Sequence, residues 1–250
     1  MRKNFFIVVA LTVISTATAF AGGEATWSYM GDTGPDKWGQ LSPSWIACRI
    51  GHYQSPIVNR NALKVSLPPL SAAINPTPLK FGLDGPTFAV PYQPGSWITI
   101  NDGRYELQAF HFHHPSEHTL NGKHYPLEAH MVLRRDGSDH NNAVMGVFID
   151  VGKTNGMLNQ FWDQLPRDKK KAVEPVEVNV GDLLPAKKEY YMYEGSMTTP
   201  GCTQGVRWFV LKHPVEASQD QIDRFIDDLT EGEANNRPVQ PTYGRVIVEN

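Results

Sequence analysis

Residues 110–118 read Phe-His-Phe-His-His-Pro-Ser-Glu-His, and residues 127–131 read Leu-Glu-Ala-His-Met. These two stretches decide the fold because their polar and apolar side chains alternate in the manner of β-strands. Seven of the nine histidines lie between residues 111 and 140: His111, His113, His114, His118, His124, His130 and His140. Such a concentration indicates a function that needs imidazole.

In an extended strand, side chains point alternately to the two faces of the sheet, so His111 and His113 share a face. The turn residues Asn-Gly-Lys at 121–123 favour a neighbouring antiparallel strand, on which Glu128 and His130 also share a face. The pattern therefore predicts three neighbouring imidazoles. Three neutral imidazoles suit zinc and leave the fourth tetrahedral position to water, as in catalytic zinc sites.

An ordinary structural role is the alternative for these histidines. A single histidine on a strand is usually a core or surface residue, and a His-x-His pair alone is a weak sign of metal. A third histidine, together with the carboxylates of Glu117 and Glu128 as partners for the ligand rings, favours the metal site.

The loop at residues 195–200, Gly-Ser-Met-Thr-Thr-Pro, offers hydroxyl groups for such a site. Zinc on three imidazoles lowers the pKa of its bound water to about 7 and so yields hydroxide at neutral pH. A hydroxyl that accepts the hydroxide's proton, and donates its own to a fixed carboxylate, would orient the attacking oxygen. Thr-Thr-Pro is also ordinary turn chemistry, so the loop alone carries little weight.

The first 21 residues have the features of a secretory signal peptide. A basic start, an apolar stretch over residues 5–14 and small residues up to Ala21 are typical of this class. A membrane anchor is the alternative, but the apolar stretch is too short to span a bilayer. We expect the mature protein, residues 22–250, to be periplasmic or secreted and to carry no membrane anchor.

Composition allows one sizeable core, because 40% of the 250 residues are hydrophobic and only 20% are charged. The net charge of −3 gives no field that would attract nucleic acid. The one basic run, residues 167–171, is interpreted as a solvated surface. Cys48 and Cys202, an even pair in an oxidising compartment, predict one disulfide, with two free buried thiols as the alternative.

The rest of the chain predicts one mainly β domain with short peripheral helices. Residues 24–60 are expected to form an irregular segment anchored by aromatic side chains, and prolines between 68 and 94 exclude long helices there. Strands are expected over residues 79–83, 87–90, 97–100, 105–113, 127–134, 143–151, 190–194, 206–211 and 245–248. Helices are expected over residues 158–164 and 218–229, the second capped by Ser218.

Motifs spread over nearly the whole mature chain resemble those of the α-class carbonic anhydrases. They are Phe-His-Phe-His at 110–113, Ser-Glu-His-Thr at 116–119, Glu-Ala-His at 128–130, Gly-Ser-Met-Thr-Thr-Pro at 195–200, Gly-Val-Arg-Trp at 205–208 and Asn-Arg-Pro-Val-Gln-Pro at 236–241. The similarity continues upstream in Trp-Ser-Tyr at 27–29, Trp-Gly at 38–39 and Gln-Ser-Pro-Ile at 54–57. The resemblance implies a large twisted, mostly antiparallel sheet with zinc at the base of a conical cavity.

The resemblance also implies a role for each matching residue. Zinc would be bound by His111, His113 and His130. Thr198 would accept a hydrogen bond from the zinc hydroxide and donate one to Glu117. Thr199 would lie beside the substrate, Tyr29 would belong to the water network, and Glu128 would support His130. The carbon dioxide pocket would be lined by Val132, Val144, Met197 and Trp208. Cys48 and Cys202 would form a disulfide.

Several residues depart from the family pattern. Fast members relay protons through a histidine, where this chain has Pro86, which does not titrate. Ala109 replaces a glutamine that often supports the first zinc histidine, and Met197 replaces leucine. Gly201 stands where a second proline is common, so the Thr198 loop is expected to be flexible unless a disulfide restrains it.

The expected activity is the reversible zinc-dependent hydration of carbon dioxide to bicarbonate and a proton by attack of zinc hydroxide, with an impaired or alternative proton relay. Its partners are the small molecules carbon dioxide, water and bicarbonate, and the protein is expected to be a monomer or a homodimer. A catalytically weak zinc- or ligand-binding relative is the alternative. A zinc hydrolase of another class is disfavoured because the sequence lacks a His-Glu-x-x-His motif.

Overall fold

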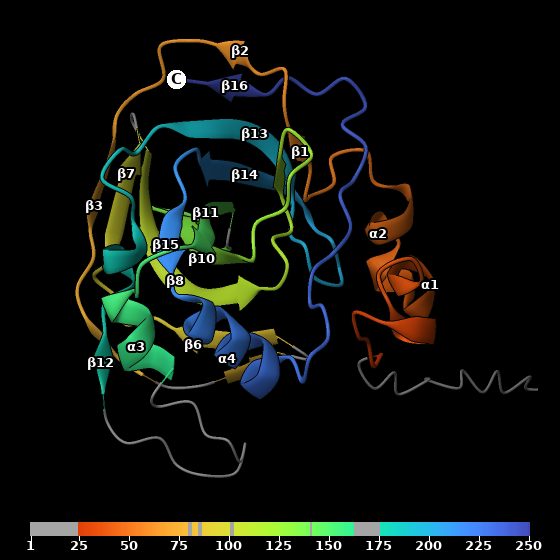
Figure 1. Ribbon diagram of the computed structural model, residues 1–250. Helices are drawn as coiled ribbons and strands as arrows, with labels where there is room; N and C mark the ends of the chain where they lie inside the picture. The colour runs from red at the N-terminus through yellow and green to blue at the C-terminus, as the bar shows by residue number, and fades with distance from the viewer. Residues whose placement is uncertain (1–24, 80–81, 85–86, 101–102, 141, 163–175) are drawn as a thin grey trace, which may run out of the picture.

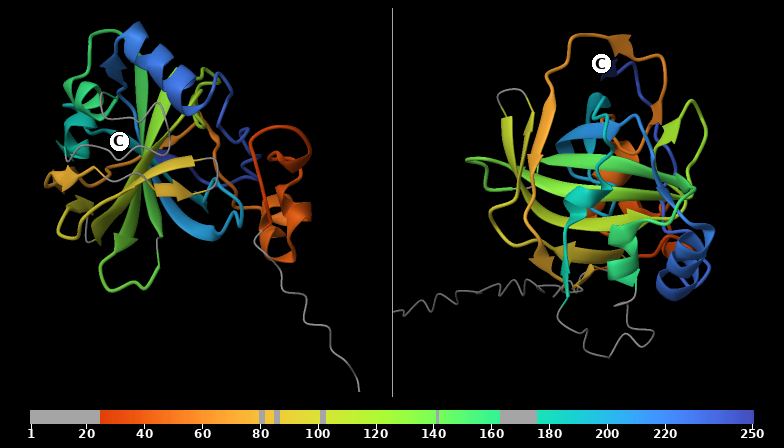
Figure 2. Two further views of the ribbon diagram at one scale, coloured as in Figure 1. Left: turned by 90° about the horizontal axis from the view of Figure 1, so that it is seen from below. Right: turned by 60° about the vertical axis from the view of Figure 1, so that its left-hand side comes forward.

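The computed structural model describes residues 25–250 apart from 80–81, 85–86, 101–102, 141 and 163–175. The predicted signal peptide and the basic run lie outside these ranges. Its dominant element is a twelve-stranded, curled sheet (Figures 1 and 2). The strands of this sheet are β2 (Leu63–Lys64), β3 (Leu70–Ala73), β5 (Gly82–Asp84), β6 (Thr87–Pro91), β7 (Trp97–Ile100), β8 (Gly103–His113), β10 (Leu127–Arg135), β11 (Ala143–Val151), β13 (Tyr190–Ser196), β14 (Gln204–Leu211), β15 (Val215–Ala217) and β16 (Val248–Glu249).

The remaining elements are short. Strand β1 (Val58–Asn59) pairs in parallel with β9 (Thr119–Leu120), and β4 (Thr77–Pro78) pairs antiparallel with β12 (Glu177–Val178). The helices are η1 (Gly31–Thr33), α1 (Trp38–Leu41), η2 (Pro43–Trp45), α2 (Ala47–Ile50), α3 (Gly156–Trp162), η3 (Val180–Leu183) and α4 (Gln219–Leu229). No helix in the described part of the chain is long and apolar enough to cross a membrane.

The centre of the sheet is formed by β8, β10 and β11, as the sequence predicts. β10 and β11 are buried along almost their whole length because neighbouring elements cover both faces, which explains their nearly continuous apolar sequence. The turn at 121–123 is present: Asn121 and Gly122 have positive φ angles of 53° and 87°, a conformation that suits these two residue types. It lies within a longer connection that also contributes β9.

The sheet is mixed. Most neighbouring strands are antiparallel, but β11 runs parallel to both β14 and β15, and β16 runs parallel to β2. The expectation of a mostly antiparallel sheet therefore understates the parallel pairs. Parallel neighbours need a long connection, and between β11 and β14 the chain passes through α3, η3 and β13.

The two longer helices lie side by side against the sheet (Figure 1). Helix α4 begins as predicted, with a capping box in which Ser218 Oγ accepts from the Gln221 N–H and the Gln221 side chain returns to the Ser218 N–H. Helix α3 begins two residues earlier than predicted because Asn155 Oδ1 accepts from the N–H groups of Met157 and Leu158. The predicted end of α3, residues 163–164, lies outside the described residues.

The final strand prediction, residues 245–248, is mostly wrong. Strand β16 contains only Val248–Glu249. Arg245 instead holds a loop together: its guanidinium donates to the carbonyls of Gln54, Glu194 and Thr242. The strand predicted over 79–83 is likewise replaced by the short β4 and β5, with residues 80–81 outside the described ranges.

Two apolar cores lie on the two faces of the sheet. The larger joins the sheet to the helices, for example through Phe112, whose ring lies 5.2 Å from Trp162 and 5.9 Å from Phe225. The smaller contains Val144, Tyr193 and Trp208 and lies on the face that carries His130. The histidine site is therefore built on a face that is already tightly packed.

The predicted disulfide between Cys48 and Cys202 is confirmed. It connects helix α2, in an N-terminal segment that packs through the ring cluster of Trp27, Tyr29 and Trp38, to the loop after β13. Gly201 has a φ of 95°, a conformation that favours glycine. The adjoining disulfide supplies the restraint that the glycine itself lacks.

Loss of this disulfide should lower the free energy of unfolding by about 2–5 kcal/mol, because the bridge closes a loop between residues separated by 154 positions. The measurement is guanidinium denaturation of the Cys48→Ser/Cys202→Ser variant beside the oxidised protein. The oxidised protein with added dithiothreitol is the second comparison. Equal transition midpoints for the variant and the oxidised protein would contradict the prediction.

Candidate metal centre and active site

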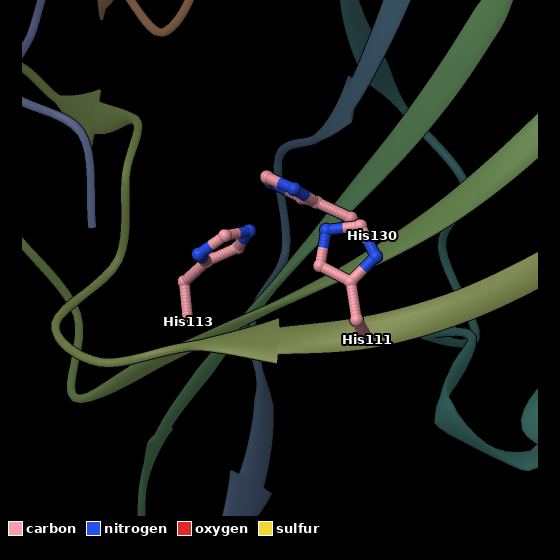
Figure 3. Close-up of side chains that lie close together, drawn as sticks. All are labelled: His111, His113 and His130. Carbon is pink, nitrogen blue, oxygen red and sulfur yellow. The ribbon is translucent and has the colours of Figure 1, made fainter. Parts of the chain in front are cut away.

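Three histidines from two adjacent strands converge on one point (Figure 3). Strand β8 places His111 and His113 on one face, and the register of β10 puts His130 directly opposite His111. The ring centroids are 4.6–5.2 Å apart. One nitrogen of each ring lies within 4.8 Å of the others.

The hydrogen bonds of two rings leave one nitrogen of each free. His113 Nδ1 donates to the Asn235 carbonyl at 2.7 Å, so its Nε2 carries a lone pair, and that buried atom has no hydrogen-bond partner within the described residues. His130 Nε2 lies 2.9 Å from Glu128 Oε1, so its Nδ1 is the free atom. Buried, unpartnered imidazole nitrogens that face one another fit a metal ion and would otherwise be costly.

His111 is held differently. Its imidazole makes no hydrogen bond within the described residues, and the Ala109 side chain has no group to offer one. The Gln108 side chain donates to Glu106 instead. The His111 ring is therefore held by packing, chiefly against His113 and His130, as the replacement at Ala109 predicts.

Burial sets the protonation of the cluster. It lowers the pKa of His111 well below its usual value, with His113 adding to the effect, and it also lowers the pKa of His113. Burial acts on His130 in the same direction, but the Glu128 carboxylate outweighs it and raises the pKa of His130. Neutral rings at His111 and His113 are the state that binds metal.

Glu128 supports His130 through a buried network. One of its oxygens, Oε1, lies 2.9 Å from His130 Nε2 and 2.8 Å from His118 Nδ1, and the other accepts from the His118 N–H. His118 Nε2 in turn accepts from the Tyr193 hydroxyl at 2.6 Å. Burial opposes ionisation, yet His118 and His130 hold the pKa of Glu128 well below its usual value. Because His118, Glu128 and His130 bond to one another, they form a support rather than a second metal site.

Glu117 lies behind the cluster. Its Oε1 accepts from the Arg237 N–H at 2.8 Å and is 3.7 Å from His113 Nδ1. Its Oε2 is 3.9 Å from His130 Nδ1 and, within the described residues, has no hydrogen-bond partner. Thr198 is buried in the loop after β13, and no hydrogen bond joins it to Glu117 in this structure. Glu117 therefore presents a free acceptor beside the histidines.

Arg237 fixes this carboxylate from the far end of the chain. Its side chain is buried, and its guanidinium donates to the carbonyls of Ser55 and Cys48. Burial lowers the pKa of Arg237 to about 10, which leaves it charged at neutral pH. The N-terminal segment, the disulfide region and Glu117 are thus joined through Arg237 in the C-terminal loop.

An apolar wall adjoins the cluster. Val132, Val144 and Trp208 stand opposite one another on β10, β11 and β14, and the Trp208 ring lies 4.9 Å from His130. Met197 is half-buried against the same core. The structure thus brings together the four residues expected to form an apolar pocket.

The remaining predicted residues lie as follows. Tyr29 is buried, with its ring centroid 6.3 Å from that of His113, and Thr199 is half-buried in the loop beside Thr198. His114 turns away and bonds to the Pro126 carbonyl. Pro86 lies outside the described residues.

The sequence did not identify three residues that support the site. Asn235 accepts hydrogen bonds from the His113 ring and from the His114 N–H. Tyr193 donates to His118, and Arg237 donates to Glu117. Arg237 lies inside a recognised motif, so its position was visible. Nothing in the local sequence indicates what it contacts.

Fold and site together define a mainly β protein whose central strands hold a buried three-histidine cluster suited to a metal ion. Residues 33–250 match the family described as eukaryotic-type carbonic anhydrase. The chain belongs to this family, the α-class carbonic anhydrases, whose enzymes hydrate carbon dioxide.

Similar proteins support the assignment over nearly the full length. A carbonic anhydrase of Nostoc sp. is 38% identical over 261 residues, covering 99% of this chain and 97% of the relative. One from Pectobacterium carotovorum is 37% identical, covering 99% of this chain and all of its own. The α-carbonic anhydrase of Thermovibrio ammonificans, solved with the inhibitor sulfanilamide, superposes with a TM-score of 0.82 at 40% identity, covering 90% of this chain and 100% of that one.

Proposed function

We propose that the chain hydrates carbon dioxide with a zinc ion held by His111, His113 and His130. The observation that carries this proposal is the unpartnered, buried His113 Nε2, which faces the free nitrogen of His130 beside His111. Imidazole donors suit zinc, and three protein ligands leave a fourth position for water. Zinc bound there would lower the pKa of that water to about 7 and so supply hydroxide at neutral pH.

Thr198 and Glu117 then orient the attacking oxygen. The Thr198 hydroxyl accepts the proton of that oxygen and donates its own to the free Oε2 of Glu117. A carboxylate can only accept hydrogen bonds, so the attacking oxygen donates to Thr198 and Thr198 donates to Glu117. Arg237 keeps the carboxylate in place through its backbone N–H.

The apolar wall of Val132, Val144, Met197 and Trp208 receives carbon dioxide, which has no charge and gains little from polar contacts. Thr199 lies next to the substrate and product, and Tyr29 contributes to the water network at the site. The chain acts outside the cytoplasm, in the periplasm or as a secreted protein, after removal of residues 1–21. The bacterial relatives and the Cys48–Cys202 disulfide support this location.

Each turnover must also release a proton, and Pro86 removes the side chain that would relay it. Carbon dioxide hydration, measured by stopped flow on the zinc-loaded, oxidised protein, should therefore rise steeply with buffer concentration, because buffer must take the proton directly. The measurement is repeated with buffers of different pKa at constant pH and ionic strength.

The same experiment decides between the enzyme and a catalytically weak zinc- or ligand-binding relative. Absence of hydration at every buffer concentration, with one zinc bound per chain, would overturn the proposed activity. A fast rate that does not depend on buffer would retain the activity but show that another group relays the proton.

A further inference from the structure

A second pocket, about 540 Å³ in volume, lies on the opposite side of β13 and β14 from the histidines. Neighbouring residues on β14 point to opposite faces. Trp208 contacts His130, whereas Phe209 and Arg207 line this pocket. Of the residues described at the metal site, Tyr193 also lines this pocket, but it reaches His130 only through His118 and Glu128. The three histidines do not line the pocket, so its contents do not touch the reacting atoms.

The body of the pocket is aromatic and apolar. Tyr105, Tyr190 and Phe209 provide ring surfaces, with the Tyr105 and Tyr190 rings 5.7 and 5.8 Å from the Phe209 ring. Met192 and Val246 complete the wall, and Val246 is 62% exposed, which marks the open side. A cavity of this size and lining suits a small, mainly apolar molecule.

The rim is positively charged. Arg207 is exposed, and among the described residues its guanidinium makes one hydrogen bond, a long contact of 3.4 Å to the Tyr105 hydroxyl. Beyond it lies a smaller hollow of about 90 Å³, which shares Tyr105, Glu194 and Arg207 with the pocket and adds Arg135. Neither Arg135 nor Arg207 forms an ion pair within the described residues. Among the described lining residues of the two hollows, Glu194 is the only acidic one, and it offsets part of this charge.

Arg245, the other arginine of the pocket, plays a different part. Its guanidinium donates to backbone carbonyls and lies over the rings of Tyr53 and Tyr193. It therefore builds the wall, whereas Arg207 has donors to spare. A ligand that complements this arrangement carries an aromatic ring for the wall and one negative charge for the rim.

We propose that this pocket binds an aryl carboxylate, with the ring between Tyr190, Phe209 and Met192 and the carboxylate on Arg207. A guanidinium matches a carboxylate with two parallel hydrogen bonds, which favours this group over a compact inorganic anion that would leave the apolar body empty. The site is separate from the metal centre and does not depend on the proposed function.

The test is a titration of the oxidised, zinc-loaded protein with 2-naphthoate, in which binding is measured by calorimetry and located by backbone amide NMR. A carboxylate also has access to a catalytic metal, so the location of the shifts decides the result. Saturable binding should shift the amides of Met192, Phe209 and Val246 and leave those of His111 and His130 unchanged. The neutral 2-naphthamide should bind roughly threefold to tenfold more weakly, since it lacks the charge that pairs with Arg207.

Two variants and one control sharpen the result. Arg207→Gln should weaken 2-naphthoate to the affinity of the amide, and Val246→Trp should fill the open side and abolish binding of both probes. Arg60→Gln removes an exposed arginine that does not line the pocket and should have no effect. The proposal would be overturned by the absence of saturable binding, by amide shifts confined to the histidine strands, or by unchanged binding in Arg207→Gln. Self-association that buries the pocket and excludes the probe would also overturn it.

Discussion

Replacement of His130 by alanine should abolish both zinc retention and carbon dioxide hydration. The variant removes one of the three proposed ligands, and it also takes away a partner of the buried Glu128 carboxylate. The loss of metal affinity should exceed the roughly 10- to 100-fold that follows removal of a supporting partner alone. The measurements are the zinc content after dialysis against a weak chelator and the hydration rate by stopped flow.

His140→Ala is the matched control, because His140 lies in the same histidine-rich window but is exposed, and its hydrogen bonds among the described residues go to Ser138 and Asp139. It should retain full zinc content and full activity. Circular dichroism of both variants separates ligand loss from unfolding. A folded His130→Ala protein that holds one tightly bound zinc would contradict the assignment of the ligands.

Replacement of Thr198 by valine should lower kcat/KM by on the order of 10²-fold or more, while zinc content stays unchanged. Valine keeps the shape of threonine but has no hydroxyl, so nothing accepts the proton of the attacking oxygen or donates to the free Oε2 of Glu117. Because the hydroxyl does not contact the metal ligands through a hydrogen bond here, metal affinity should be unaffected.

Thr203→Val is the control for this variant. Thr203 is exposed in the same loop, and its hydrogen bond among the described residues is made by the backbone carbonyl, which accepts from the Met197 N–H. It should leave both kcat/KM and zinc content near the wild-type values. A Thr198→Val protein as active as Thr203→Val would show that the hydroxyl has no part in orienting the nucleophile.

The sequence predicts the elements whose identity depends on local pattern. Alternation sets β8, a continuous apolar run sets β11, and the Ser218 capping box starts α4. The three converging histidines follow from the same alternation on β8 and β10 together with a turn signal. Each of these features is determined by residues a few positions apart.

Features that depend on contacts between distant parts of the chain cannot be predicted from local sequence patterns. The parallel pairing of β11 with β14 depends on a connection of several elements, and the end of the last strand is displaced by the Arg245 loop. The tautomer of His113 is set by Asn235, which lies 122 residues further along the chain. No local pattern carries such information.

The contacts of Asn235 and Arg237 also bear on the order in which the protein is made. A growing chain carries all three histidines when little more than half of it has been synthesised, whereas the residues that set the His113 ring and the Glu117 carboxylate come close to the end. Nascent chains and C-terminally truncated chains therefore have imidazoles but no preorganised centre. We therefore expect metal uptake to require the completed chain, and a C-terminal truncation before Asn235 should impair the site as a ligand substitution would.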